Sequence, residues 1–246
     1  MSTNVNASQQ AAARMSQTDF RLVLGSRSPR RRTLLESDGY RFAILPAFDD
    51  VEENVSVAEL NPQEYVRQLA IAKARNVAER LCGKVSQGRW DVDPVFSNAS
   101  AGDPYLVLAC DSVAVCNGEI LGKPDDRDDA QRMLRKLSGS RHEVDTGLAL
   151  WRVDFEDYET GPNVEKLVSR VEISVLKMET LSEEKLQRYL DGGLWEGKAG
   201  AFGYQDGVDW LELLSGSESN VVGLPLEALA ETLLKLFPET NEDKTS

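Results

Sequence analysis

Apolar and polar residues recur with regular periods over most of the chain, and these periods predict an order of strands and helices. Apolar runs at residues 21–25 and 41–45 predict two short buried strands, and residues 61–81 carry apolar residues at helical spacing. The apolar stripe of this helix comprises Val66, Leu69, Ala70, Val77 and Leu81. Lys73 falls in the middle of the stripe, where a lysine either extends to the surface or points into a site.

The second half of the chain predicts several further strands. Residues 105–110 form the most apolar run, which predicts a strand that ends at Asp111, and a short strand then leads to a hairpin turn at Asn117 and Gly118. Beyond this turn the pattern predicts helices over residues 128–137, 182–190 and 226–237, and strands over residues 142–151, 164–178, 201–205 and 210–214. Because strands alternate with helices and some strands are joined by hairpins, we expect one α/β domain with a mixed sheet and flanking helices.

Three stretches lack these periods. Residues 1–18 and 238–246 are expected to be a disordered leader and tail, and residues 83–104, rich in Gly, Ser, Asn and Asp, to be a surface insertion in a domain spanning residues 19–237. The leader lacks the apolar core of a secretory signal, although Arg14 without a preceding acidic residue leaves an amphipathic targeting segment open. No apolar run is long enough to span a membrane.

Composition narrows the classes of function. The chain has 246 residues and a formal net charge of −13, which disfavours broad nucleic-acid binding because the phosphate backbone would be repelled. Its three cysteines form no CxxC pair and leave one unmatched, so free thiols in a reducing compartment such as the cytoplasm are expected. The single histidine, His142, excludes a site with several histidine ligands, and its place at the start of a predicted strand favours a structural role.

One segment departs from the acidic balance of the chain. In LVLGSRSPRRRTLLE, residues 22–36, Ser28 is a good N-cap, and Pro29 suits the first position of a helix. Three arginines, residues 30–32, then follow in the first turn, where the helix dipole disfavours positive charge. Free backbone N–H groups and guanidinium groups together are typical of a phosphate site, and a solvated basic patch or a targeting signal is the alternative.

Acidic and basic residues near the ends of predicted elements are candidates for chemistry. Asp111 follows the most apolar strand, and ligands of α/β sheets gather outside the carboxyl ends of strands. Glu53, in an acidic run, could join Asp111 around a hard divalent cation, because such cations prefer carboxylate oxygens and water. Lys123 and Lys198 each follow a glycine in a predicted loop, where a lysine can reach a phosphate. A turn-forming Asp111, a solvated acidic loop and solvated lysines are the alternatives.

Seven ordered blocks of this sequence resemble the Maf family of nucleotide pyrophosphatases, a family named for septum formation. The blocks are LVLGSRSPRRRTLLE (22–36), LAIAKA (69–74), ACDS (109–112), GEILGKP (118–124), MLRKLSGSRHEVDTGLAL (133–150), GKAGAFGYQ (197–205) and GSESNVVGLPL (216–226). The resemblance implies one elongated mixed α/β domain with a central cleft. It also implies hydrolysis of nucleoside triphosphates to monophosphate and pyrophosphate, with Mg²⁺ or Mn²⁺ and in a homodimer.

The resemblance assigns roles to individual residues. Asp111 takes the position of the proton acceptor, and Glu53 and Asp111 take the positions that would hold the metal. The positions that face the phosphates are Ser28, Arg30, Arg31, Lys73, Lys123 and Lys198. Ser112 and Gln205 match base-reading positions of the branch that hydrolyses dTTP and UTP, because a glutamine amide can both donate to and accept from uracil or thymine.

Departures from the family pattern leave alternatives open. Gly25 stands for a usual alanine, Phe202 for a usual tyrosine and Ser112 for a usual threonine. The preferred substrate could therefore be a modified nucleotide, as in a house-cleaning pyrophosphatase. A regulator of cell division that binds nucleotides without hydrolysing them is the alternative of another class. A protein that uses its basic patch for interactions is disfavoured by the net charge.

Overall fold

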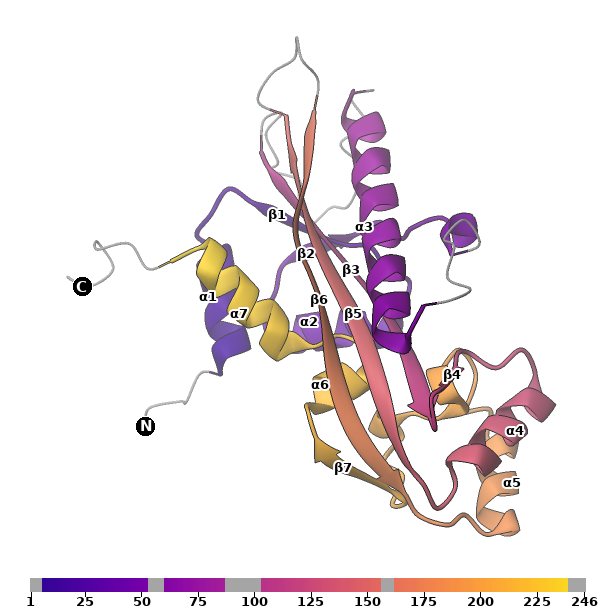
Figure 1. Cartoon of the computed structure of the whole chain (residues 1–246). Coiled ribbons are helices and arrows are strands. Elements are labelled where there is room, and N and C mark those ends of the chain that lie inside the picture. Colours follow the sequence, from indigo (N-terminus) through magenta and orange to yellow (C-terminus); the bar gives the residue numbers. More distant parts are fainter. Residues whose placement is uncertain (1–5, 53–59, 87–102, 156–161, 239–246) are drawn as a thin grey trace, which may run out of the picture.

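A computed structural model describes residues 6–52, 60–86, 103–155 and 162–238 (Figure 1). Its sheet has seven strands in the order β2-β1-β3-β5-β6-β7, with β4 paired to β3. The strands are β1 (Arg21–Leu24), β2 (Phe42–Ile44), β3 (Tyr105–Cys116), β4 (Glu119–Leu121), β5 (Arg141–Asp154), β6 (Asn163–Met178) and β7 (Leu211–Ser215). Pairs β1–β2 and β1–β3 are parallel, and the other pairs are antiparallel, so the predicted mixed α/β sheet is confirmed.

Helices cover both faces of this sheet (Figure 1). They are α1 (Ala7–Met15), α2 (Pro29–Ser37), α3 (Pro62–Ser86), α4 (Arg127–Leu137), α5 (Glu183–Asp191), α6 (Glu218–Val222) and α7 (Leu226–Leu236). One apolar cluster joins the buried side of α3 to alternate residues of β1, β3 and β5, and a second joins α1, α2 and α7 to the opposite face. A third cluster gathers α4 and α5 around the far ends of the long strands.

The contact between α3 and β5 is unusually close. A Cβ atom built on Gly147 of β5 would lie 2.2 Å from the backbone oxygen of Val66 in α3, so only glycine fits there. The residue opposite Gly147 in the sheet is Asp111 of β3. Lys73 stands seven residues after Val66, on the same side of the helix, and the close contact therefore sets the height of Lys73 above β3.

The strand predicted to end at Asp111 instead continues to Cys116. Its edge explains how Asp111 can still reach a site. Neighbour β1 ends at Leu24, opposite Leu108, and β3 pairs with its other neighbour β4 only from Ala114 onward. Between these two neighbours the edge of β3 is open, and the carboxyl end of β1 meets the opening. The strand end at this opening is that of β1, and the prediction that β3 ends at Asp111 is wrong.

Residues 7–15 form helix α1, so the prediction of a disordered leader over residues 1–18 is wrong for them. Asn6 caps the helix in a reciprocal capping box with Gln9. The buried side chains Ala11 and Met15 belong to the same apolar cluster as α7. The apolar spacing of this segment is built mostly from alanine, which carries little signal beside the polar residues around it.

Other boundaries also differ from the predictions. Helix α3 runs on to Ser86, so the predicted insertion begins inside a helix, and residues 87–102 lie outside the described residues, as do residues 239–246 of the predicted tail. The strand predicted over residues 201–205 is wrong, because two short 3₁₀ turns occupy this segment. Gly200 adopts a positive φ of 68°, which bends the chain and is incompatible with a strand. The Asn117–Gly118 hairpin turn is confirmed by positive φ at both residues.

Candidate active site

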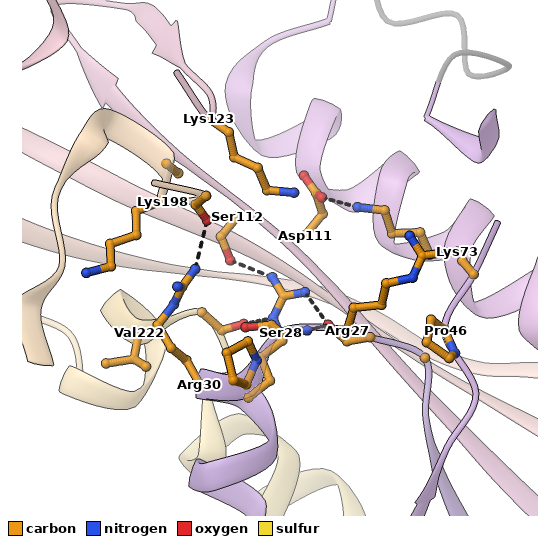
Figure 2. A pocket seen from close by; sticks show the side chains of 18 of the residues that line it. Arg27, Ser28, Arg30, Pro46, Lys73, Asp111, Ser112, Lys123, Lys198 and Val222 are labelled. Carbon is orange, nitrogen blue, oxygen red and sulfur yellow. Dashed lines mark hydrogen bonds and ion pairs between the residues drawn. The ribbon is translucent and has the colours of Figure 1, made fainter. Parts of the chain in front are cut away.

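A cavity of about 630 Å³ opens beside the free edge of β3. Its walls come from the start of α2, the middle of α3, the segment around residues 196–205, and the end of α6 (Figure 2). All eight residues predicted to bind substrate line it together with Asp111: Ser28, Arg30, Arg31, Lys73, Ser112, Lys123, Lys198 and Gln205. Glu53, the other predicted metal ligand, lies outside the described residues.

The charge of this cavity is opposite to that of the chain. Six lysine and arginine side chains line it against four carboxylates, whereas the whole chain carries a net charge of −13. The cavity is therefore a local positive region, and the field of its walls favours an anionic ligand. The start of α2 adds free backbone N–H groups to the same wall.

Asp111 and Lys73 form a largely buried ion pair that lines the cavity. The Lys73 ammonium lies 2.5 Å from Asp111 Oδ1 and 2.6 Å from Glu52 Oε1, so one cation holds two carboxylates together. Lys73 and Asp111 side chains are each only 13% exposed. The position of Lys73 in the apolar stripe of α3 is thus resolved, because the side chain points into the site and not to the surface (Figure 2).

Glu52 was not among the predicted site residues, although it belongs to the same acidic run as Glu53. Burial alone would raise the pKa of Glu52, but the hydrogen bond and charge of Lys73, with the fields of Lys123 and Arg31, lower it. The ionised carboxylate is therefore the stable form. The sequence showed an acidic run after a strand, and only the fold could show which acid of the run faces Lys73.

The donor set fits a magnesium-like cation. Asp111 and Glu52 offer two carboxylates, and Mg²⁺ is commonly held by one or two carboxylates with substrate phosphates and water. Within the described ranges no cluster of three or more His, Cys, Asp or Glu side chains is suited to a metal ion. This arrangement suits a cation that arrives with a phosphate ligand better than one held by protein groups alone.

Arg31, which is predicted to face the phosphates, lines the cavity and contacts four protein groups. Its Nε donates to the carbonyl of Gly223 at 2.7 Å, and Nη1 donates to the carbonyl of Cys110 at 2.8 Å. The guanidinium also contacts the hydroxyls of Ser26 and Ser112, each at 3.2 Å. Because Cys110 lies where β3 has lost its neighbour β1, Arg31 replaces a missing strand contact and ties α2, β3 and α6 together.

The other two arginines of the run differ from Arg31 and from each other. Arg30 lines the cavity and donates to the carbonyl of Gly197 at 3.0 Å. Burial lowers the pKa of Arg30, as does the neighbouring charge of Arg31, while Asp206 opposes this shift. Arg32 pairs with Glu36 on the exposed side of α2. Three adjacent arginines thus have three different roles, which helical geometry imposes by turning each about 100° from the last.

Ser28 occupies the N-cap position of α2, but its side chain makes no capping hydrogen bond. Its backbone N–H donates instead to the hydroxyl of Ser26 at 3.2 Å. The predicted cap hydrogen bond is therefore absent, and the Ser28 hydroxyl stays available on the cavity wall. A side chain that leaves the first-turn N–H groups free is consistent with an anion site at this terminus.

Lys198 lies at the other end of the cavity and is almost fully buried. Its ammonium lies 2.7 Å and 2.5 Å from the two carboxylate oxygens of Asp206. Figure 2 shows Lys123 and Lys73 extending toward Asp111, whereas Lys198 extends away from it. In the part of the chain that the structure describes, Lys123 has no hydrogen bond or ion pair, so its charge is available to a ligand.

His142 has a structural role, as its position suggested. The ring is buried and packs edge-on against Phe202 at a centroid distance of 5.2 Å. Burial lowers the pKa of His142 to about 4, so the ring is neutral at pH 7. Its ring helps to hold the segment that carries Phe202 and Gln205, and it is not among the described residues that line the cavity.

Fold and site together define a class: an α/β protein with a cavity that is lined by an excess of cations and contains a carboxylate paired with lysine. The family described as Maf-like protein matches residues 21–236. The chain therefore belongs to the Maf-like protein family. Among the described residues, no helix has the length and apolar character needed to cross a membrane.

Several proteins named dTTP/UTP pyrophosphatase are similar to this chain over most of its length. A protein of Rhodopirellula baltica named dTTP/UTP pyrophosphatase is 44% identical over 226 residues, which cover 92% of this chain and 86% of the relative. A protein of Hahella chejuensis with the same name is 40% identical over 84% of this chain and 87% of the relative. A third, from Ruminiclostridium cellulolyticum, is 38% identical over 87% of this chain and 95% of the relative.

Proposed function

We propose that this protein is a nucleoside triphosphate pyrophosphatase that hydrolyses dTTP and UTP to the monophosphate and pyrophosphate. The observation that carries the proposal is Asp111, a carboxylate held by Lys73 inside a cavity lined by an excess of cations. A cavity of this charge suits a triphosphate, and a carboxylate within it suits proton transfer from water. The names of the relatives from three organisms support the same activity.

Binding of the triphosphate would use the cations that are not committed to the scaffold. Lys123 is free to contact a phosphate oxygen, and Arg30 retains guanidinium N–H groups beyond the one used by Gly197. The Ser28 hydroxyl and the N–H groups at the start of α2 complete an anion-binding wall. Arg31 would act mainly by holding this wall in place, because four protein groups already occupy its guanidinium.

The hydrolytic step can be written with Asp111 as general base. A water oxygen attacks the α-phosphorus, the bond from this phosphorus to the oxygen bridging to the β-phosphorus breaks, and one water proton passes to Asp111. Pyrophosphate carries away the electron pair of the broken bond. Lys73 keeps the carboxylate in position at 2.5 Å, while Lys123 neutralises charge that develops on phosphate oxygens.

A divalent cation fits the same site. Asp111 and Glu52 are the described residues that would hold Mg²⁺ or Mn²⁺ together with the phosphates of the substrate. When bound, such an ion supplies additional positive charge to the triphosphate. The place of Glu53 in this set stays a prediction.

Selection of the base is assigned to Gln205 and Ser112. Both line the cavity, and the amide of Gln205 can donate to a carbonyl of uracil or thymine and accept from its ring N–H. The Ser112 hydroxyl is held between Arg31 and Thr146, the latter at 2.8 Å. It is thus the more rigid of the two contacts, and Gln205, which is exposed, is the more adaptable.

The decisive experiment measures pyrophosphate release from canonical and methylated nucleoside triphosphates, with Mg²⁺ or Mn²⁺, for the wild type and Asp111→Asn. Binding of a hydrolysis-resistant α,β-imido analogue of dUTP is measured in parallel by calorimetry. We expect release from dTTP and UTP, a loss of about 10³-fold in kcat in Asp111→Asn, and retained binding. The matched control is Asp128→Asn, an exposed acid of α4, which should leave kcat unchanged.

Other outcomes identify the alternatives. Release from methylated nucleotides alone would make the protein a house-cleaning pyrophosphatase and would remove Gln205 as a reader of uracil and thymine. Binding without release in the wild type would favour a nucleotide-dependent regulator. Equal loss of binding and turnover in Asp111→Asn would contradict the general-base role and would favour Asp111 as a ligand of the metal.

Assembly and location complete the proposal. We infer a homodimer, which light scattering at several protein concentrations would test. We also infer a cytoplasmic location, where the thiols of Cys82, Cys110 and Cys116 would stay reduced, since all three are free in this structure.

A further inference from the structure

Asp206 is a buried carboxylate that the proposed mechanism does not use. It closes the 3₁₀ turn Tyr204–Asp206 and follows Gln205 directly. Unlike Lys198 and Gln205, it is not among the described residues that line the cavity. Its side chain is 10% exposed and lies behind the wall that Lys198 forms. A carboxylate in this place has no direct contact with a ligand in the cavity and can act only through its neighbours.

Asp206 accepts hydrogen bonds from the side chains of Lys198, Tyr189 and Gln205, the last from Nε2 to Oδ1 at 3.4 Å. Both carboxylate oxygens accept from Lys198 Nζ, at 2.7 Å and 2.5 Å, and Oδ2 also accepts from the Tyr189 hydroxyl at 2.9 Å. The Tyr189 hydroxyl accepts in turn from the backbone N–H of Gly203 at 3.1 Å. Tyr189 and the backbone of the turn therefore hold the Asp206 carboxylate in place, and the carboxylate in turn holds the Lys198 ammonium.

The backbone at Gly203 leaves space for the ion pair between Asp206 and Lys198. A Cβ atom on Gly203 would lie 2.4 Å from Asp206 Oδ2 and 2.6 Å from Lys198 Nζ. Glycine at this position therefore makes room for the ion pair itself. An ammonium group has three N–H donors, and the two carboxylate contacts leave one for a ligand in the cavity.

We infer that Asp206 is a positioning residue for substrate binding, which holds the Lys198 ammonium on the cavity wall with one donor directed to an anionic ligand. The inference rests on the proposed function, because the ligand is taken to be the triphosphate. Without the carboxylate, the largely buried Lys198 ammonium would lose its counterion, and Arg30, whose guanidinium feels the charge of Asp206, would lose a nearby negative charge. Binding would weaken, while the chemistry at Asp111 would continue.

The test is a double-mutant cycle of Asp206→Asn and Lys198→Met, read by steady-state kinetics with dTTP. We expect Asp206→Asn to raise KM about tenfold with kcat changed less than about threefold, because a charged contact that aids binding is lost. In the Lys198→Met background the same substitution should change KM less than about twofold. The matched control is Asp209→Asn, since Asp209 is an exposed acid three residues away that contacts Lys185.

Two results would overturn the inference: an unchanged KM in Asp206→Asn, or an equal effect in both backgrounds. Thermal unfolding of each variant separates a folding defect from a local one, and only KM of folded protein is compared. Calorimetric binding of the α,β-imido analogue of dUTP repeats the cycle without turnover. A wild type that binds but does not hydrolyse would overturn the proposed function alone, and a wild type that hydrolyses without coupling between the two residues would overturn this inference alone.

Discussion

A lysine contacts carboxylates at each end of the cavity, and the two ends place the lysine and the acid in opposite positions. At one end Lys73 holds Asp111 and Glu52, and Asp111 itself lines the cavity. At the other end Lys198 is held by Asp206, and here the lysine lines the cavity with the acid behind it. The same two functional groups therefore serve different purposes. A carboxylate inside the cavity can take a proton, while one behind the wall can only direct a cation.

The largest expected difference between the two ends of the cavity is the effect of replacing Lys73 on kcat. We expect Lys73→Met to lower kcat by at least about 10²-fold, because it leaves Asp111 and Glu52 without their shared cation in a partly buried place. Initial rates with saturating dTTP measure this. A change confined to KM would mean that Lys73 serves binding, and the contrast between the ends would disappear.

Lys198→Met should affect the opposite parameter. It removes a contact to the ligand and leaves Asp111 untouched, so KM should rise about tenfold with kcat within about threefold of the wild type. Full kinetic curves for both lysine variants, prepared side by side, make the comparison. A fall of kcat as large as that of Lys73→Met would show that both ends take part in the chemical step.

Arg31→Lys should affect both ends together. A lysine keeps the charge but cannot reproduce the fork that reaches Gly223 and Cys110 at once, so the wall between the ends should loosen. We expect a loss of about 2 kcal/mol in the free energy of unfolding and a lower kcat/KM. Urea unfolding and kinetics measure the two effects. If the variant were as stable as the wild type, Arg31 would have no structural role, and the prediction that it binds phosphate would be favoured.

Asp145 tests stability alone, in the scaffold under the Asp111 end. It is fully buried on β5, where Gln63 Nε2 donates to its Oδ2 at 2.9 Å. Burial, aided by the charge of Glu143, raises the pKa of Asp145 to about 6 from an ordinary 3.8. The native state then binds more protons than the unfolded state between about pH 4 and 6, so this group makes stability fall as the pH rises through that window.

Asp145→Asn removes this dependence, because the amide is neutral and its oxygen can still accept from Gln63. We expect the variant to gain about 3 kcal/mol in the free energy of unfolding at pH 7 and to match the wild type near pH 4. Urea unfolding at pH 4, 5, 6 and 7 gives the difference. A difference independent of pH would contradict the raised pKa.

Sequence periodicity predicted the elements whose signals are local. The stripe of α3, the hairpin at Asn117 and Gly118 and the mixed sheet followed from apolar spacing and turn chemistry. The 3₁₀ turns that carry Asp206 were mistaken for a strand, because an apolar run has no period over so few residues. Helix α1 was missed since its buried face consists mainly of small residues that need α7 to be buried.

The sequence predicted which residues form the site, but it did not predict which of them form ion pairs with each other. The cations and Asp111 stood out by their positions beside predicted strands and loops, and the fold brings them into one cavity. Which acid pairs with which lysine depends on tertiary contacts between distant segments. Glu52 reaches Lys73 across a loop, and Asp206 reaches Lys198 through a turn, so neither pair has a signature in spacing.

The absence of one carbon atom at Gly147 has a mechanical consequence. A helix is stiff along its axis, so a displacement imposed on α3 at Val66 would carry to Lys73 two turns later with little loss. A methyl group at position 147 would push the helix outward by about 1 Å or more, a shift large enough to open a 2.5 Å contact beyond hydrogen-bonding range. Gly147 thus fixes the distance between α3 and β5, and with it the contact between Lys73 and Asp111, although β5 contributes no side chain to that contact.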